Sequence, residues 1–167
     1  ANDRLYASFN NGDYLQVQAT TQFYNGTLQM IVSRVEQAVA EKVIEADFIT
    51  LGVADVEQMA RELAELLHRL QHPLLRELAD RFLQDEVFMR RFCTAPAGIK
   101  NHHAYRGGLL EHVLSLLRLA AIVGPLYPRV DSDLLLIGAF LHDIGKTIEL
   151  NYVRDLSYSD PGQLIGH

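Results

Sequence analysis

Two long apolar stretches in the C-terminal half of the chain each carry residues that can bind a metal ion. His112 lies in the first stretch, which continues to Val123, and His142 and Asp143 stand near the end of the second, which begins at Leu134. Nearly unbroken apolar stretches of this length predict helices that are buried on most of their surface. Imidazole nitrogen and carboxylate oxygen together suit divalent metals. The sequence therefore predicts a helical bundle in which two facing helices build one metal site.

Three short segments give these residues a recognisable context. They are residues 102–112, residues 142–146, which read His-Asp-Ile-Gly-Lys, and residues 162–167. Together they resemble the HD superfamily of metal-dependent phosphohydrolases. Within that superfamily they are most similar to the YhaM-type 3′-to-5′ exoribonucleases, which carry an OB-fold, a small β barrel that can bind nucleic acid, ahead of the HD domain.

The resemblance implies an α+β protein in three parts. It places a partial OB-like nucleic-acid-binding domain at residues 1–50, a helical connector at residues 51–92, and an HD domain, an all-α helical bundle, at residues 93–167. We expect the first strands of the OB-like domain to lie outside this sequence. We also expect the HD domain to be incomplete at its C-terminus, because the HD pattern includes a later aspartate that no residue here supplies. Weak or no hydrolysis is therefore expected from these residues alone.

The N-terminal part reads as a pair of strands. Residues 14–20 alternate polar and apolar positions, as a half-buried strand does, and residues 28–32 end in β-branched side chains. Between them, Asn25-Gly26 favours a tight hairpin turn. A further short strand is expected near residues 5–9. A hairpin alone is only marginally stable, so the pair is expected to belong to a larger sheet.

Two tyrosines on this segment, Tyr14 and Tyr24, are candidate nucleic-acid-binding residues. Aromatic rings on an OB-type sheet can stack on the bases of a single strand. The alternative, that these rings belong to a core, stays open, and Phe23 fits the core interpretation better.

Apolar periodicity and turn residues predict six helices. They are expected over residues 56–71, 74–84, 87–92, 108–123 and 132–144, with the last one beginning at Asp160-Pro161. Asp55 and Gln58 have the spacing of a capping box at the start of the first helix. Gly145 is a natural end for the helix over 132–144.

The resemblance also assigns metal ligands. It implies that His112, His142 and Asp143 hold one or two divalent cations and that His167 belongs to the same cluster; otherwise His167 is an incidental histidine. Manganese, cobalt, magnesium, iron and nickel are the candidate cations. Such a site activates water for attack on phosphorus.

Lys146 and His103 are the expected catalytic residues. Lys146 would neutralise a phosphate oxygen beside the cation, or else is a solvated lysine after a helix end. His103 is favoured over His102 to face the substrate, with packing of the loop as the alternative. Glu111 either orients a metal-binding histidine or is a solvated helix residue.

The composition bounds the partners and the setting. The net charge of −6 argues against a basic nucleic-acid clamp, but not against a nuclease, because bound cations bring their own charge. The single cysteine, Cys93, excludes an internal disulfide and fits a reducing, cytoplasmic setting. Its side chain reads as an ordinary apolar one. No run approaches about 18 uninterrupted apolar residues, so neither a transmembrane helix nor a membrane partner is expected.

These features together predict a metal-dependent phosphodiester hydrolase, and the resemblance implies a 3′-to-5′ exoribonuclease on single-stranded RNA, with DNA left open as a substrate. One alternative is an HD-type phosphodiesterase of small nucleotides or cyclic dinucleotides, which needs no OB-like domain. A second alternative is a non-catalytic nucleic-acid-binding or regulatory module. A homo-oligomer is compatible with each of these functions.

Overall fold

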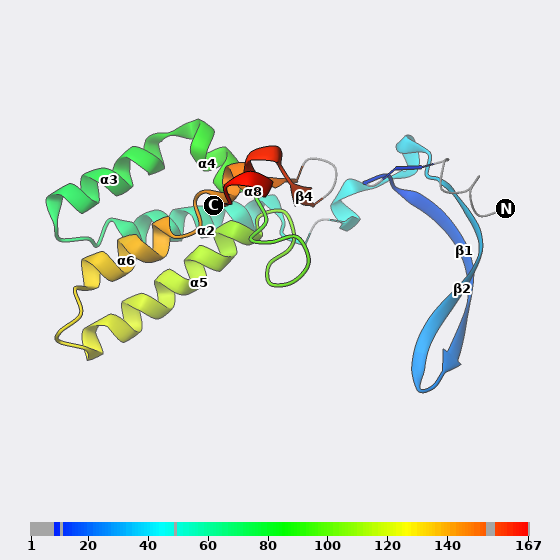
Figure 1. The fold of residues 1–167 in the computed structure, drawn as a ribbon, viewed down its shortest axis with the longest axis horizontal. Helices are drawn as coiled ribbons and strands as arrows, with labels where there is room; N and C mark the ends of the chain where they lie inside the picture. The colour runs from blue at the N-terminus through cyan, green and yellow to red at the C-terminus, as the bar shows by residue number, and fades with distance from the viewer. Residues whose placement is uncertain (1–8, 11, 49, 153–155, 167) are drawn as a thin grey trace. The chain divides into compact units, whose positions relative to one another are not determined.

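The structure is a computed structural model of the chain, and it describes residues 9–10, 12–48, 50–152 and 156–166 (Figure 1). The chain divides into two compact units, Ala1–Phe48 and Ile49–His167. The first contains the longer of two short sheets, and the second is mainly helical. An antiparallel β unit followed by a helical bundle confirms the predicted α+β class.

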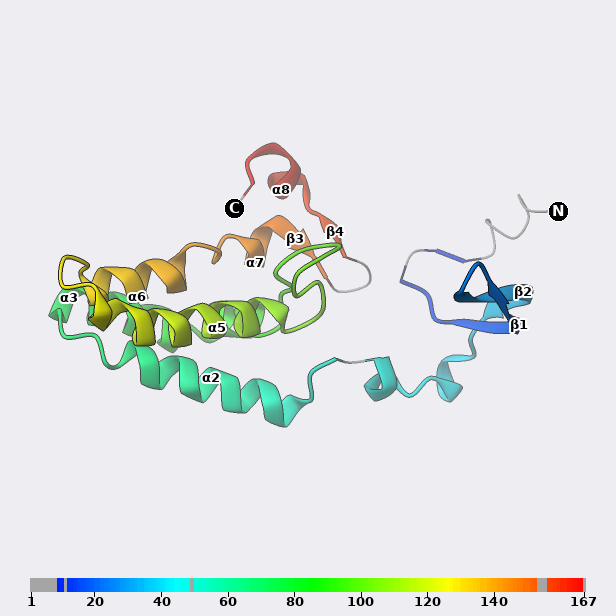
Figure 2. The ribbon, with the colours of Figure 1, turned by 90° about the horizontal axis from the view of Figure 1, so that it is seen from below.

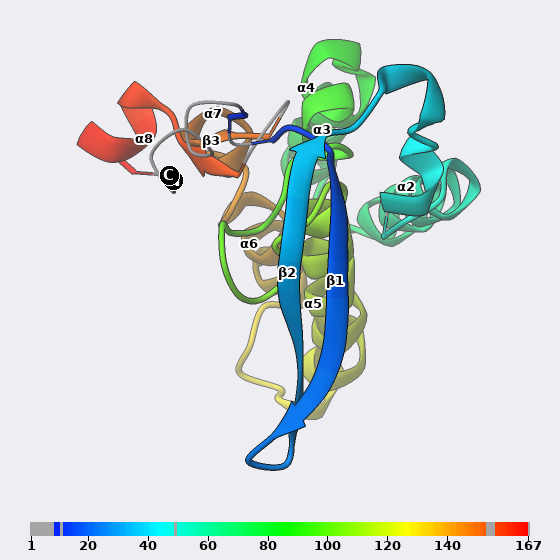
Figure 3. The same cartoon turned by 90° about the vertical axis from the view of Figure 1, so that its right-hand side faces the viewer.

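The N-terminal unit is built around a β-hairpin, which Figure 3 shows along its length. β1 (Leu15–Tyr24) pairs antiparallel with β2 (Thr27–Gln37), with one irregularity in the ladder. Asn25 and Gly26 have positive φ angles of 49° and 78°, as expected for the type I′ turn that joins right-twisted strands. The two predicted strands and their turn are confirmed, and both strands are longer than predicted.

The hairpin presents apolar side chains on exposed surface. Phe23, for which the core is the favoured location, is instead 77% exposed, because the described residues of this unit provide no second layer above the two strands. The hairpin is followed by two 3₁₀ turns, Ala40–Lys42 and Glu45–Phe48. Most of the strand expected near residues 5–9 lies outside the described residues. The OB-like assignment therefore stays a prediction.

Five helices form the bundle of the C-terminal unit. They are α2 (Val53–Leu67), α3 (Pro73–Gln84), α4 (Glu86–Phe92), α5 (Gly108–Val123) and α6 (Ser132–Leu141). α5, which has the bounds that the sequence predicts, lies between α2 and α6 (Figure 2). Its buried side chains include Leu109, Val113 and Leu117 at intervals of four residues, which places them along one face of the helix. This face packs in the core that supports the site described below.

The start and end of α2 differ from the prediction for physical reasons. The helix begins at Val53, and the Asp55 carboxylate accepts a hydrogen bond from the Gly52 amide at 3.2 Å. Asp55 therefore lies inside the first turn and reaches back, rather than preceding the helix. The helix ends at Leu67, before the predicted end at residue 71. The turn that follows is held by Asp133, whose carboxylate accepts hydrogen bonds from the backbone amides of residues 71 and 72, at 2.8 and 2.6 Å.

α6 ends at Leu141, three residues before the predicted end. The amide of His142 still bonds to the carbonyl four residues earlier, but that of Ile144 bonds to the carbonyl of Leu141, only three residues earlier. This tighter turn leads directly into α7 (Lys146–Glu149). Gly145, expected to stop the helix, has φ −63° and continues the turn in a helical conformation. His142 and Asp143 therefore stand on a turn beyond α6.

A small hairpin and a short helix complete the described chain. β3 (Leu150–Asn151) pairs with β4 (Ser157–Tyr158), and α8 follows over Asp160–Leu164. The predicted helix start at Asp160 is confirmed. The capping residue is one position earlier, because the Ser159 hydroxyl accepts a bond from the amide of residue 162 at 3.0 Å.

By length and composition alone, Gly108–Leu126, which contains α5, is a candidate to cross a membrane. The sequence predicts no transmembrane helix on the criterion of uninterrupted apolar runs alone, and that criterion therefore does not identify this segment. Its contacts explain its apolar character in another way, because it packs against α2 and α6. Its Arg118 side chain donates two hydrogen bonds to the Glu62 carboxylate of α2, one of them at 2.6 Å. These contacts join α5 to the helical bundle.

Candidate metal centre

The ends of α5 and α6 bring three potential ligands together. His112 lies in the first turns of α5, and His142 and Asp143 follow the last residue of α6. Nε2 of His112 is 3.3 Å from Nε2 of His142 and 3.5 Å from Oδ2 of Asp143. Nε2 of His142 is 3.4 Å from the same carboxylate oxygen. The sequence prediction that these three side chains meet is therefore confirmed.

The spacing of the three donor atoms fits a divalent cation. Ligand atoms about 2.1 Å from a tetrahedrally coordinated ion lie about 3.4 Å from one another. The three atoms here are separated by 3.3, 3.4 and 3.5 Å. Three protein ligands also leave a coordination position for water or substrate. Two imidazoles with one carboxylate suit transition metals better than magnesium, which prefers oxygen ligands throughout.

A hydrogen bond outside the triangle sets the orientation of His142. Its Nδ1 lies 2.9 Å from the carbonyl oxygen of Ala139. Because a carbonyl can only accept, Nδ1 carries the hydrogen, and Nε2 presents its lone pair to His112 and Asp143. Metal-binding histidines commonly make such a bond through the nitrogen that does not bind the metal.

The protonation of the site also favours a cation. Burial lowers the pKa of His112; Asp143 opposes this effect and the charge of His142 adds to it. A lowered pKa favours the neutral imidazole, which is the form that binds metals. Asp143 is only 7% exposed, and a buried carboxylate needs positive partners.

Lys146 is already engaged in the protein. Its Nζ donates to the carbonyl oxygen of Ala97 at 2.7 Å and lies 3.6 Å from Oδ2 of Asp143. It therefore ties the loop before α5 to the turn after α6. An ammonium has three donors, so the expected contact with phosphate is compatible with this geometry and stays a prediction.

His103 lies in the loop before α5 and is bonded to Glu111. Its Nδ1 is 2.9 Å from Oε2 of Glu111 and 2.8 Å from the Tyr105 hydroxyl, and that hydroxyl also donates to Glu111. The hydrogen bond from Tyr105 lowers the pKa of Glu111 against the effect of burial, and the bond from His103 adds to the lowering. Burial and Glu111 raise the pKa of Tyr105 to about 12. These hydrogen bonds join the Glu111 carboxylate to His103 and Tyr105 rather than to a ligand of the triangle.

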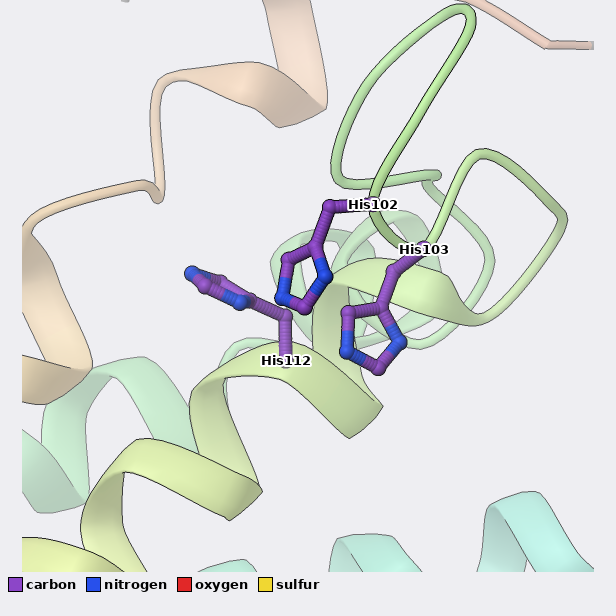
Figure 4. Close-up of side chains that lie close together, drawn as sticks. All are labelled: His102, His103 and His112. Atoms are coloured by element: carbon purple, nitrogen blue, oxygen red, sulfur yellow. The ribbon is translucent and has the colours of Figure 1, made fainter.

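His102 and His103 also lie beside His112, as Figure 4 shows. One nitrogen from each of the three rings lies within 4.8 Å of the other two. The ring centroid of His112 is 5.3 Å from that of His102 and 5.7 Å from that of His103. The sequence prediction that His103 faces the site is compatible with this position.

The remaining predicted site residues lie elsewhere. Tyr14 packs against Phe48 in the N-terminal unit, with ring centroids 4.7 Å apart, so that one side of its ring has a protein partner. Tyr24 ends β1 at the hairpin turn and is 62% exposed. His167 lies outside the described residues. Base stacking by the tyrosines and metal binding by His167 stay predictions.

Two partners in the site, Tyr105 and the Ala97 carbonyl, have no counterpart in the sequence prediction. A backbone carbonyl gives no sequence signal. Tyr105 stands close to the histidine pair and the Gly107-Gly108 pair, and that grouping is the one signal that could have drawn attention to it.

Comparisons with known proteins relate the helical unit to a family. Residues 109–161 match the HD domain. Three curated relatives from strains of Listeria monocytogenes, each named 3′-5′ exoribonuclease YhaM, are 33% identical to the chain over 162 residues. The match covers 96% of this chain and 51% of each relative, so the chain spans about half the length of these relatives. No solved structure matches the chain.

Proposed function

We propose that the chain acts as a metal-dependent hydrolase that shortens single-stranded RNA from its 3′ end. The proposal starts from its HD-type character and its similarity to the YhaM exoribonucleases. The observation that carries the proposal is the convergence of His112, His142 and Asp143 at cation-binding distances. The substrate is inferred from the relatives, which are named as exoribonucleases.

The residues of the site have distinct roles in this proposal. His112, His142 and Asp143 hold the cation, which supplies Lewis acidity to a phosphate and to water. Lys146 keeps the Asp143 carboxylate in place and adds positive charge where the phosphate enters. His103 faces the substrate beside His112. The N-terminal unit guides the single strand, with the exposed ring of Tyr24 and the partly exposed ring of Tyr14 as stacking surfaces.

The test is digestion of a 5′-end-labelled single-stranded RNA by the full-length protein with Mn²⁺, Co²⁺ or Mg²⁺. We expect shortening from the 3′ end that stops in excess chelator and is absent in Asp143→Asn. Asp80→Asn is the matched control, because Asp80 lies on α3 beside the exposed His68. Digestion that persists in chelator would contradict the metal-dependent mechanism. Hydrolysis of cyclic dinucleotides or small nucleotides in place of RNA would assign the site to another HD-type reaction.

A further inference from the structure

The backbone of His103 is held in a conformation that is unfavourable for a histidine. Its φ angle is 51°, in the left-handed region that non-glycine residues seldom adopt. Its carbonyl oxygen accepts bonds from the amides of Ala97 and Tyr105, at 3.1 and 3.0 Å. Gly108 lies directly against it, since a Cβ at residue 108 would be 2.1 Å from that oxygen. Strained conformations persist only where surrounding contacts determine them, and such sites are often functional.

The side chain of His103 is fixed as firmly as its backbone. Oε2 of Glu111 lies 2.9 Å from its Nδ1 and also accepts the hydrogen of the Tyr105 hydroxyl. A carboxylate has only acceptors, so Nδ1 of His103 must be the donor. In the neutral ring the other nitrogen, Nε2, therefore keeps its lone pair. The side chain is 16% exposed, which leaves it shielded but reachable.

The free nitrogen is turned toward the metal-binding side. Figure 4 shows one ring nitrogen of His103 on the side where His112 lies and the other on the far side. A donor nitrogen of His103 lies within 4.8 Å of donor nitrogens of His102 and His112. We expect a water molecule that attacks phosphorus next to a cation at His112 to lie on this same side of the His103 ring.

We propose that Glu111 and Tyr105 are positioning residues, and that they hold His103 so that Nε2 accepts a hydrogen bond from the attacking water. The inference rests on the proposed hydrolase function and deepens it. It assigns His103 to the water rather than to the cation or to loop packing. It assigns Glu111 to His103 rather than to the metal-binding histidines.

The first experiment reads the tautomer without any catalysis. In long-range ¹H–¹⁵N spectra of the metal-free full-length protein with ¹⁵N-labelled histidine, His103 should show a protonated Nδ1. In Glu111→Gln the side-chain amide can donate as well as accept, so we expect a mixture of tautomers. Tyr105→Phe removes one hydrogen bond to Glu111 and should have a smaller effect. Glu65→Gln, on the exposed face of α2, should leave the His103 signals unchanged.

The second experiment separates the water from the metal. In Glu111→Gln we expect kcat on single-stranded RNA to fall by about 10- to 100-fold, the usual cost of losing a residue that orients an active-site group. KM and the affinity for Mn²⁺, measured by titration calorimetry, should stay within about twofold of the wild-type values, while Glu65→Gln should match the wild type throughout.

Each unfavourable outcome has a separate meaning. An unchanged His103 tautomer in Glu111→Gln overturns the inference, whatever the activity. Loss of Mn²⁺ affinity in His103→Ala shows that His103 binds the cation, which also overturns it. If the wild-type protein does not digest RNA while Glu111→Gln shows the expected change of the His103 tautomer, the proposed substrate is contradicted and the positioning of His103 by Glu111 still stands.

Discussion

Substitution of Gly108 by alanine tests how closely the loop before α5 is fitted to the helix. An alanine Cβ would lie 2.1 Å from the carbonyl oxygen of His103 and 3.0 Å from its Cβ. Unstrained non-bonded contacts are about 3.5 Å long, so the His103 backbone must move by at least about 1 Å. The Cβ of Gly138 in α6 meets nothing within 4 Å. Gly138→Ala therefore makes the same chemical change in a helix without a clash.

The expected effect on stability follows from the bonds at risk. The carbonyl oxygen of His103 accepts hydrogen bonds from Ala97 and Tyr105 at 3.1 and 3.0 Å. A movement of about 1 Å weakens both, at about 0.5–1.5 kcal/mol each. Gly108→Ala should therefore lower the free energy of unfolding by about 1–3 kcal/mol and the Tm by about 2–4 °C per kcal/mol. Gly138→Ala should raise stability by about 0.5–1 kcal/mol, because alanine favours a helix more than glycine does.

Thermal melting of the two variants, together with RNA digestion, checks this reasoning. A displacement of about 1 Å in an active-site group can reduce the rate by about 100-fold, so Gly108→Ala should lose most of its activity even at temperatures at which it is folded. Gly138→Ala should keep its activity. A Gly108→Ala protein as stable and as active as wild type would refute the close fit between Gly108 and His103.

Three further predictions concern other parts of the C-terminal unit. Asp143→Asn removes the one carboxylate of the donor triangle, and we expect Mn²⁺ affinity by titration calorimetry to fall by at least about tenfold; an unchanged affinity would place the cation elsewhere. The hydrogen bond from Arg118 lowers the pKa of Glu62 from its ordinary value of 4.5, so this pair stabilises the fold above that pH and the stabilisation is lost as the pH falls through the lower folded value. Denaturant midpoints of Glu62→Gln should therefore depend less on pH below about 5 than those of wild type, and parallel curves would contradict the prediction. Burial raises the pKa of the Cys93 thiol to about 11, so at pH 8 only about one thiol in a thousand is ionised; a thiol-reactive disulfide should label native Cys93 far more slowly than the denatured chain, and equal rates would show that Cys93 is not protected.

Much of the helical unit could be predicted from the sequence because its apolar pattern is simple. Leu109, Val113 and Leu117 recur every four residues, and the helix that buries them has the predicted bounds. The hairpin turn at Asn25-Gly26 was equally clear, because few other residues tolerate its positive φ angles. Where local chemistry alone determines a helix or turn, the sequence predicts its position.

Helix ends were harder to predict because distant residues determine them. The backbone amides in the turn after α2 donate their hydrogen bonds to the carboxylate of Asp133, more than sixty positions along the chain. No local pattern around residues 67–72 contains that information. The same limit applies to Lys146, since its ammonium bonds to the carbonyl of Ala97, forty-nine positions earlier.

The positions of the histidines differ in the same way in how far the sequence predicts them. His142 and Asp143 are neighbours in sequence at the end of an apolar helix, so their meeting with His112 needed only the packing of two helices. The placement of His103 depends on a left-handed backbone, a glycine pressed against its carbonyl, and a hydroxyl shared with Glu111. None of these has a repeat or a spacing that a single sequence reveals. Because these three features together fix the position of His103, any substitution that releases its imidazole should affect catalysis before it affects the cation, and this order of effects distinguishes His103 from the ligands beside it.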